Sequence, residues 1–344
     1  MDNSVESKCL TKLIEHFSLS IEESKELMDL FLSGKFNPRL ASSILSIISF
    51  KGEQPEELAG FSKSLTEQMK KFNSPYDNLI DLVGTGGDNK KTFNISTVAS
   101  LIIASLGIKV AKQIRFSASA CCGSGDLLKS LGVNLEATYE QKKQCLDEEN
   151  FVFINSLEYY TVIDKIKEIE KELNLHTILS LLPPLCHPAK VNRIIIGTPD
   201  RIRASLMARS LELTGIDKAY VLWNEAGYDE IVPIGNTRVI VIERGKEKRE
   251  LVLTANDFAI SGNYKVGTAI KGGTLEYNKE TLYEIDNLTH GIALDTIIMN
   301  VSLALRLSGV IEHLKDGAEL IKTNFKKGMI SDKVQRISKI TNSA

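Results

Sequence analysis

A glycine-rich turn between two apolar runs places the strongest constraint on the fold. The stretch DLVGTGGDNKKTFNIST, residues 81–97, has three glycines in four positions. A strand-like run precedes them, and a helix-like run begins near Asn94. In an open α/β sheet, such a junction lies at the carboxyl ends of the strands, where ligands bind. Glycines permit positive φ and leave backbone N–H groups uncovered, so the turn predicts a site for a phosphorylated ligand.

Strand-like and helix-like runs alternate beyond this turn. The predicted strands lie at residues 79–84, 108–114, 151–154, 219–223 and 237–245. The predicted helices lie at residues 95–107, 125–132 and 165–173, and over much of the chain after about Tyr283. Strands that alternate with helices predict βαβ units and a largely parallel sheet.

The first 72 residues show helical patterns only. Ser20 to Glu23 form a capping box, and Pro38 and Pro55 stand at the first position of the next two predicted helices. The turn-rich sequence NSPYDN, residues 73–78, then predicts a domain boundary. We expect an α/β protein with a small N-terminal helical bundle domain and a large domain whose mostly parallel sheet is flanked by helices. The helical domain is predicted at residues 1–72, with a helical contribution from about 160–190, and the large domain at residues 73–344.

Composition narrows the classes of function. The chain has 344 residues, 43% apolar and 25% charged, and a formal net charge of -2, which gives no bias toward nucleic acid or an anionic membrane. No apolar run reaches the roughly 18 residues of a transmembrane helix, and the start of the chain lacks the pattern of a signal peptide. Five cysteines without a CxxC pair predict a reduced, cytoplasmic protein with neither a disulfide framework nor a zinc site.

The glycine turn does not match the common nucleotide-binding motifs. Asn89 stands where the dinucleotide motif G-x-G-x-x-G needs its third glycine, and the P-loop motif is absent. A second run of small residues, SASACCGSGD at 117–126, opens the next predicted helix, and Lys112 lies between the two runs at a predicted strand end. Two such loops predict a binding site with two phosphate-binding parts, which suits a ligand that has phosphate at both ends. The alternatives are a turn without a ligand and a solvated lysine.

Adjacent carboxylates follow the predicted strand at 219–223. Asp229 and Glu230 stand side by side in WNEAGYDEI, with Glu225 nearby. Mg²⁺ prefers one or two carboxylates together with substrate phosphate oxygens, so the pair predicts a magnesium site near the glycine turn. The alternative is a solvated acidic turn. The five histidines are scattered and show no metal-ligand spacing.

Four motifs together resemble the anthranilate phosphoribosyltransferase family. They are DLVGTGGDNKKTFNIST, KVAK, GSGDLLKSLGV and GYDE, and the likeness extends over nearly the whole chain. This family joins anthranilate to phosphoribosyl pyrophosphate (PRPP) in tryptophan biosynthesis. The resemblance implies a magnesium-dependent pentosyltransferase, with PRPP and a small aromatic or amine acceptor as its partners. It also implies a homodimer formed through the helical domains, and no partnership with a membrane or nucleic acid.

The resemblance further implies the residues of the site. Ser96, Asp229 and Glu230 would hold Mg²⁺. The residues expected around the diphosphate sugar are Gly84, Thr85, Gly86, Gly87, Asp88, Thr92, Asn94, Ser96, Thr97, Lys112 and Ser124.

The acceptor side departs from the family pattern. The family sequence Lys-His-Gly-Asn-Arg-Ser appears here as KQIRFS, residues 112–117, and Glu170 stands where a family arginine meets the acceptor. A carboxylate there would repel anthranilate by about 4 kcal/mol at about 4 Å and an effective dielectric constant of roughly 20. We therefore expect acceptor contacts from Gly84, Arg115 and Glu170, and an acceptor that can differ from anthranilate. Further departures are Ser180, Pro183 and Trp223, which replace a usual Asn, Gly and His.

Two other functions stay open from the sequence. A non-catalytic family member would bind nucleic acid or another ligand, although the net charge opposes nucleic acid. A nucleoside phosphorylase of the same fold group would bind inorganic phosphate where pyrophosphate sits. The acidic pair and the TFNIST block favour the transferase, in which pyrophosphate departs early and a weak nucleophile, held in place, adds at C1 of the ribose.

Overall fold

The computed structural model describes residues 4–86, 90–116, 122–160, 163–262, 264–265 and 270–343. The chain forms two compact units. Unit 1 comprises Met1–Lys71, Ser156–Pro188 and Ser205–Ile216, and unit 2 comprises Phe72–Asn155, Ala189–Ala204 and Asp217–Ala344. The sequence patterns did not predict that residues 205–216 belong to unit 1.

Unit 1 is built from helices. Its main helices are α1 (Val5–Ile14), α2 (Ile21–Ser33), α3 (Pro38–Lys51), α4 (Pro55–Gln68) and α9 (Asp164–Leu173), with the short α8 (Ser156–Tyr159) and the 3-10 turn η2 (Ile178–Leu181). The predicted capping box is present, because Ser20 accepts from the Glu23 N–H and Glu23 accepts from the Ser20 N–H. Helices α2 and α4 approach closely at Gly60, where an added Cβ would lie 2.4 Å from the Ile21 carbonyl oxygen. Glycine is therefore required at this crossing.

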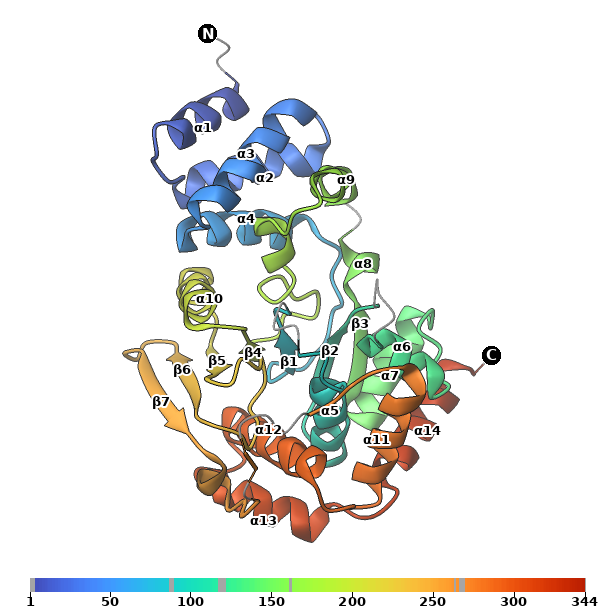
Figure 1. Ribbon diagram of the computed structural model, residues 1–344. Coiled ribbons are helices and arrows are strands. Elements are labelled where there is room, and N and C mark those ends of the chain that lie inside the picture. The colour runs from blue at the N-terminus through green and yellow to red at the C-terminus, as the bar shows by residue number, and fades with distance from the viewer. Residues whose placement is uncertain are drawn as a thin grey trace. The chain divides into compact units, whose positions relative to one another are not determined.

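Unit 2 contains a seven-stranded sheet in the order β3-β2-β1-β4-β5-β6-β7 (Figure 1). The strands are β1 (Ile80–Gly84), β2 (Val110–Ile114), β3 (Phe151–Asn155), β4 (Arg193–Gly197), β5 (Lys218–Asn224), β6 (Thr237–Glu243) and β7 (Arg249–Leu253). Strands β1 to β5 pair in parallel, whereas β6 and β7 pair antiparallel at one edge. The expectation of a mostly parallel sheet flanked by helices is confirmed.

The sequence patterns missed two of these strands. β4 lies at the centre of the sheet, yet its apolar run RIIIG follows a proline-rich stretch and was not recognised. β7 is an exposed edge strand with a mixed-charge sequence, RELVL. The predicted strands at the positions of β1, β2, β3, β5 and β6 are present.

Helices cover the sheet and form one apolar core with it. They are α5 (Ile95–Ser105), α6 (Ser124–Ser130), α7 (Tyr139–Glu149), α11 (Leu275–Asp286), α12 (Ile292–Ser308), α13 (Leu314–Asn324) and α14 (Met329–Thr341), with the 3-10 turn η3 (Ala255–Phe258). Helix α10 (Arg201–Thr214) begins in unit 2 and continues into unit 1. Across the described residues, no helix combines the length and apolarity that crossing a membrane requires.

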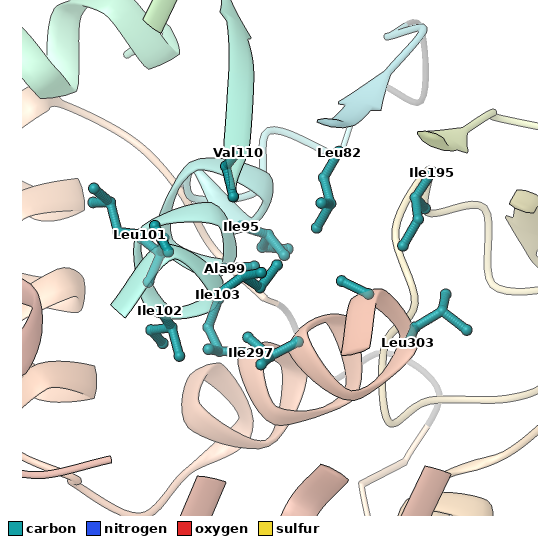
Figure 2. Packing of buried hydrophobic residues seen from close by; sticks show 14 of the residues in the cluster. Leu82, Ile95, Ala99, Leu101, Ile102, Ile103, Val110, Ile195, Ile297 and Leu303 are labelled. Carbon is teal, nitrogen blue, oxygen red and sulfur yellow. The ribbon is translucent and has the colours of Figure 1, made fainter. Parts of the chain in front are cut away.

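The core fixes α5 beneath the strand ends. Figure 2 shows Leu82, Val110 and Ile195 pointing from three neighbouring strands toward α5 and α12. Ile102 of α5 and Ile297 of α12 belong to the same cluster and are fully buried. Each such side chain contributes about 1.5–3 kcal/mol by burial. The N-terminus of α5 is thereby held at the carboxyl edge of the sheet.

A buried ion pair joins β1 to β2. Asp81 and Lys112 are 0% and 2% exposed, and the Lys112 Nζ lies 3.5 Å from the Asp81 Oδ1. Asp81 also accepts the Gln113 N–H, and the Lys112 ammonium donates to the Gln113 carbonyl. Burial raises the pKa of Asp81 to about 6, opposed in part by the Lys112 charge, and burial lowers the pKa of Lys112. The expectation that Lys112 ends its strand is wrong, because β2 continues to Ile114.

Removing one member of this pair should destabilise the fold. We expect Lys112→Met to lower the free energy of unfolding by about 3–5 kcal/mol, because it leaves a buried carboxylate without its counter-charge. A native pKa above the ordinary aspartate pKa of 3.8 means that the native state binds this proton more readily than the unfolded chain. The Asp81 contribution to stability therefore rises as pH falls through about 6, and the loss should be greater at about pH 8 than at about pH 5. Urea denaturation at both pH values measures this difference.

The double variant Asp81→Asn/Lys112→Met provides the control. Asn keeps an acceptor for the Gln113 N–H, and Met keeps the apolar stem, so most of the lost stability should return. A double variant as unstable as the single one would show that the ion pair does not account for the loss.

Candidate active site

The site lies at the point where the strand order reverses. β2 and β3 follow β1 on one side, whereas β4 and β5 lie on the other side, and ligands of open α/β sheets bind at the carboxyl ends of strands at such a point. Gly84 and Gly197 are register partners at the ends of β1 and β4, and the Thr85 N–H donates to the Gly197 carbonyl at 2.8 Å. A cavity of about 20 Å³ opens here. It is lined by Leu82, Val83, Gly84, Ser96, Ile195, Gly197, Leu222, Asp229, Glu230 and Asn300.

Two glycines make room for Asp229. A Cβ added to Gly84 would lie 2.5 Å from the Asp229 Oδ2, and a Cβ added to Gly197 would lie 1.5 Å from the Asp229 carbonyl oxygen. The Asp229 carboxylate therefore packs against the end of β1, and the Asp229 backbone packs against the end of β4. Asp229 is only 7% exposed. A position this close requires glycine at both strand ends.

Two asparagines shape the loop that carries the acidic pair. Asn224, at the end of β5, donates from Nδ2 to the Ile234 carbonyl and the Thr237 hydroxyl, and its Oδ1 accepts the Ala226 N–H. Asn300, on α12, donates from Nδ2 to the Ile231 carbonyl at 2.8 Å. Both amides are buried. Neither residue carries a chemical signature of its own, so the sequence motifs assigned no role to either.

The glycine turn and the start of α5 meet the acidic loop. The Thr92 hydroxyl lies 3.4 Å from the Glu230 Oε1. Asn94 is the N-cap of α5 but makes no side-chain cap bond, and its Nδ2 instead donates to the Cys122 carbonyl. Within the described residues, its buried Oδ1 has no hydrogen-bond partner. In the first turn of α5, the Ile95 and Thr97 N–H groups donate to the Phe93 and Asn94 carbonyls. Among the described residues the Ser96 N–H has no hydrogen-bond partner, and it can bind phosphate.

The second small-residue loop is anchored at both of its described ends. The Ser124 hydroxyl accepts the Arg115 N–H at 2.9 Å, and the Gly125 N–H donates to the Arg115 carbonyl at 3.0 Å. The Phe116 ring lies against Gly125, where an added Cβ would come within 3.0 Å of it. Arg115 and Phe116 are exposed at the end of β2.

Several predicted site residues are not among those that line this cavity, or they are outside the described residues. Lys112 points into the pair with Asp81, and Thr97 is fully buried in α5. Glu170 belongs to unit 1, where its carboxylate accepts the N–H and the hydroxyl of Thr177 at 2.9 and 2.7 Å. Gly87, Asp88 and residues 117–121 lie outside the described residues. The ligand contacts expected of these residues stay predictions.

The donor set fits Mg²⁺. Ser96, Asp229 and Glu230 line one cavity, and a Cβ added at Gly84 would lie 2.5 Å from the Asp229 carboxylate. Among the described residues, no group of three or more His, Cys, Asp or Glu side chains gathers as a metal site. Two carboxylates and a hydroxyl leave coordination positions for substrate oxygens, as magnesium sites that bind phosphate require.

Comparison with known proteins decides the family. Residues 76–330 match the α/β domain of a glycosyl transferase family, and residues 7–69 match the helical bundle domain of a glycosyl transferase family. An anthranilate phosphoribosyltransferase of Caldanaerobacter subterraneus is 32% identical over 96% of both chains. One of Vibrio cholerae is 33% identical over 96% of this chain and 98% of its own. The chain belongs to the anthranilate phosphoribosyltransferase family.

Solved structures of the anthranilate phosphoribosyltransferase family have the same fold. The crystal structure from Thermus thermophilus superimposes with a TM-score of 0.88 at 28% identity, over 97% of this chain and 99% of that chain. The Saccharomyces cerevisiae enzyme in complex with PRPP and Mg also gives a TM-score of 0.88, at 22% identity, over 100% of this chain and 99% of that chain. The predicted fold class and family are confirmed, and the chain is a member of a family of pentosyltransferases.

Substitution of the two strand-end glycines should have unequal effects. We expect Gly84→Ala to cost about 1–3 kcal/mol of unfolding free energy, because the obstructing atom is a side-chain oxygen that can rotate away. Gly197→Ala should cost more than about 3 kcal/mol, because backbone atoms of Asp229 must move. Chemical denaturation measures both values.

Gly273→Ala is the matched control, since its added Cβ would meet Tyr277 at an ordinary 3.7 Å. Its effect should stay within about 0.5 kcal/mol. Equal costs at Gly84 and Gly197 would contradict the packing of Asp229 described above.

Proposed function

We propose that this chain transfers the 5-phosphoribosyl group of PRPP to an aromatic amine, with Mg²⁺ as its cofactor. The observation that carries the proposal is the meeting of Gly84, Ser96, Asp229 and Glu230 in one cavity at the reversal of strand order. Such a cavity joins a phosphate-binding helix start to a pair of magnesium-binding carboxylates. PRPP carries a phosphate and a pyrophosphate on one sugar, which suits a binding site with two phosphate-binding parts.

The residues of this chain would act mainly by positioning. Asp229, Glu230 and Ser96 would hold Mg²⁺, which when bound supplies positive charge opposite the departing pyrophosphate. The N–H groups of the glycine turn and of the first turn of α5 would bind phosphate oxygens. The amine would add at C1 of the ribose because it is held there, and no histidine is among the described residues that line the cavity.

The acidic pair provides the first test. Asp229→Asn and Glu230→Gln should each weaken binding of PRPP in the presence of Mg²⁺ by about 10- to 100-fold, as metal-site substitutions typically do. Isothermal titration calorimetry measures the affinity without requiring an acceptor. Glu225→Gln is the matched control, because Glu225 lies on the same loop but is exposed and paired with Arg238 at 2.9 Å. Failure of the unaltered protein to bind millimolar PRPP would refute the proposal.

The acceptor is the finer part of the proposal. The curated relatives are named anthranilate phosphoribosyltransferases, but this chain presents Arg115 and Phe116 at the end of β2 where the family has Asn and Arg. The Arg115 N–H donates to the Ser124 hydroxyl, which supports a fixed backbone position for residue 115. We propose that the acceptor site is altered and that anthranilate is a poor substrate.

Turnover of anthranilate tests this part separately. With saturating PRPP and Mg²⁺, we expect a rate well below the roughly 10 per second that is typical of enzymes. The decrease of anthranilate fluorescence measures the rate, and calorimetry on the same preparation confirms that the donor binds. A rate near 10 per second would show that the substitutions at 113–116 leave anthranilate as the acceptor.

The proposal includes a second copy of the chain as a partner. Phe50 is 90% exposed and Phe17 is 61% exposed on the helical unit 1, so large apolar side chains remain there for a partner to cover. We propose a cytoplasmic homodimer formed through this unit, whose mass sedimentation equilibrium measures.

A further inference from the structure

A lysine just beyond the glycine turn lies over a tyrosine of the acidic loop. The Lys90 ammonium is 5.0 Å from the centre of the Tyr228 ring, within the range of a cation–π interaction. The Lys90 side chain also passes over Gly227, where an added Cβ would lie 3.2 Å from its Cε. A side chain at position 227 would therefore obstruct the lysine.

Tyr228 is a rigid anchor for this contact. It is 7% exposed and belongs to the apolar core of unit 2. Its carbonyl accepts the Asn224 N–H, which ties the residue to the end of β5. The next residue along the chain is Asp229. A lysine held on Tyr228 is consequently held beside the acidic pair.

Two further contacts place the same segment. The Thr92 hydroxyl lies 3.4 Å from Glu230, so residues 90 and 92 both contact the acidic loop. The Gly272 N–H donates to the Lys91 carbonyl at 2.7 Å, and a Cβ at Gly272 would lie 2.2 Å from the Thr92 carbonyl oxygen. Residues 90–92 are thus contacted by the acidic loop and by the segment around Gly272.

We propose that Lys90 and Tyr228 form a latch that holds residues 90–92, which lead into α5, against the magnesium-binding loop before the ligand arrives. Lys90 is a positioning residue in this proposal, which rests on the function proposed above. A latch formed in advance raises the fraction of molecules that are competent to bind, and the apparent affinity falls by that fraction when the latch is lost. A cation–π contact at an exposed position contributes about a two- to five-fold equilibrium factor.

The test separates the latch from the positive charge. Lys90→Met removes the ammonium but keeps the stem, whereas Lys90→Arg keeps a cation that can stack on the ring. Lys91→Met removes the same charge from the neighbouring exposed residue. Tyr228→Phe keeps the ring, and Tyr228→Leu removes it. Calorimetry with PRPP and Mg²⁺ gives the dissociation constant of each variant, and denaturation confirms that each variant folds.

The latch predicts a specific pattern of affinities. Lys90→Met should raise the dissociation constant about two- to five-fold, while Lys90→Arg, Tyr228→Phe and Lys91→Met stay within about 1.5-fold of the unaltered protein. In the Tyr228→Leu background, Lys90→Met should have no further effect. If Tyr228→Leu does not fold, the comparison of Lys90→Met with Lys90→Arg and Lys91→Met decides.

Two outcomes would overturn the latch. An equal loss in Lys90→Met and Lys91→Met would show that only charge matters, and an unchanged affinity in Lys90→Met would show that the contact has no role in binding. Both outcomes differ from failure of the proposed function, in which the unaltered protein itself does not bind PRPP and Mg²⁺.

Discussion

The contact between Asp229 and the ends of β1 and β4 is the constraint on which the site depends. Gly84 and Gly197 lack side chains, so the acidic loop can lie directly on the sheet edge. There Asp229 and Glu230 line one cavity with Ser96 at the start of α5. The core beneath, in which α5 and α12 pack under the strands, keeps these three elements in place. The chemistry proposed for the site follows from this close approach.

Sequence motifs predict the chemical groups of the candidate site more readily than the elements that surround them. The glycine turn and the acidic pair have distinct signatures, because phosphate and magnesium demand particular residue types. The central strand β4 does not, since a short apolar run beside prolines can belong to a strand or to a loop. Without β4 the strand order, and so the location of the cavity, could not be derived.

Lys112 shows why burial is hard to predict from sequence. A lysine in a strand next to a phosphate loop suggests a ligand contact, and the partner that buries it lies 31 positions away. Only the pairing of β1 with β2 brings Asp81 to it. Asn224 and Asn300 were hard to assign for the same reason, because their hydrogen bonds order the acidic loop from β5 and α12. Their role appears only when those elements are placed together.

The long sequence separation between the paired strands β1 and β4 has a consequence for how the protein folds. The partners Ile80 and Arg193 are 113 residues apart, and the chain between them contributes the 156–188 segment to unit 1. Closing so long a loop is slow, so the pairing of β1 with β4 should be among the late steps of folding. At about 5–20 residues per second of synthesis, β1 waits roughly 6–23 seconds on the ribosome for β4 to appear. During that interval its apolar edge is exposed, and the nascent chain is a candidate client for chaperones.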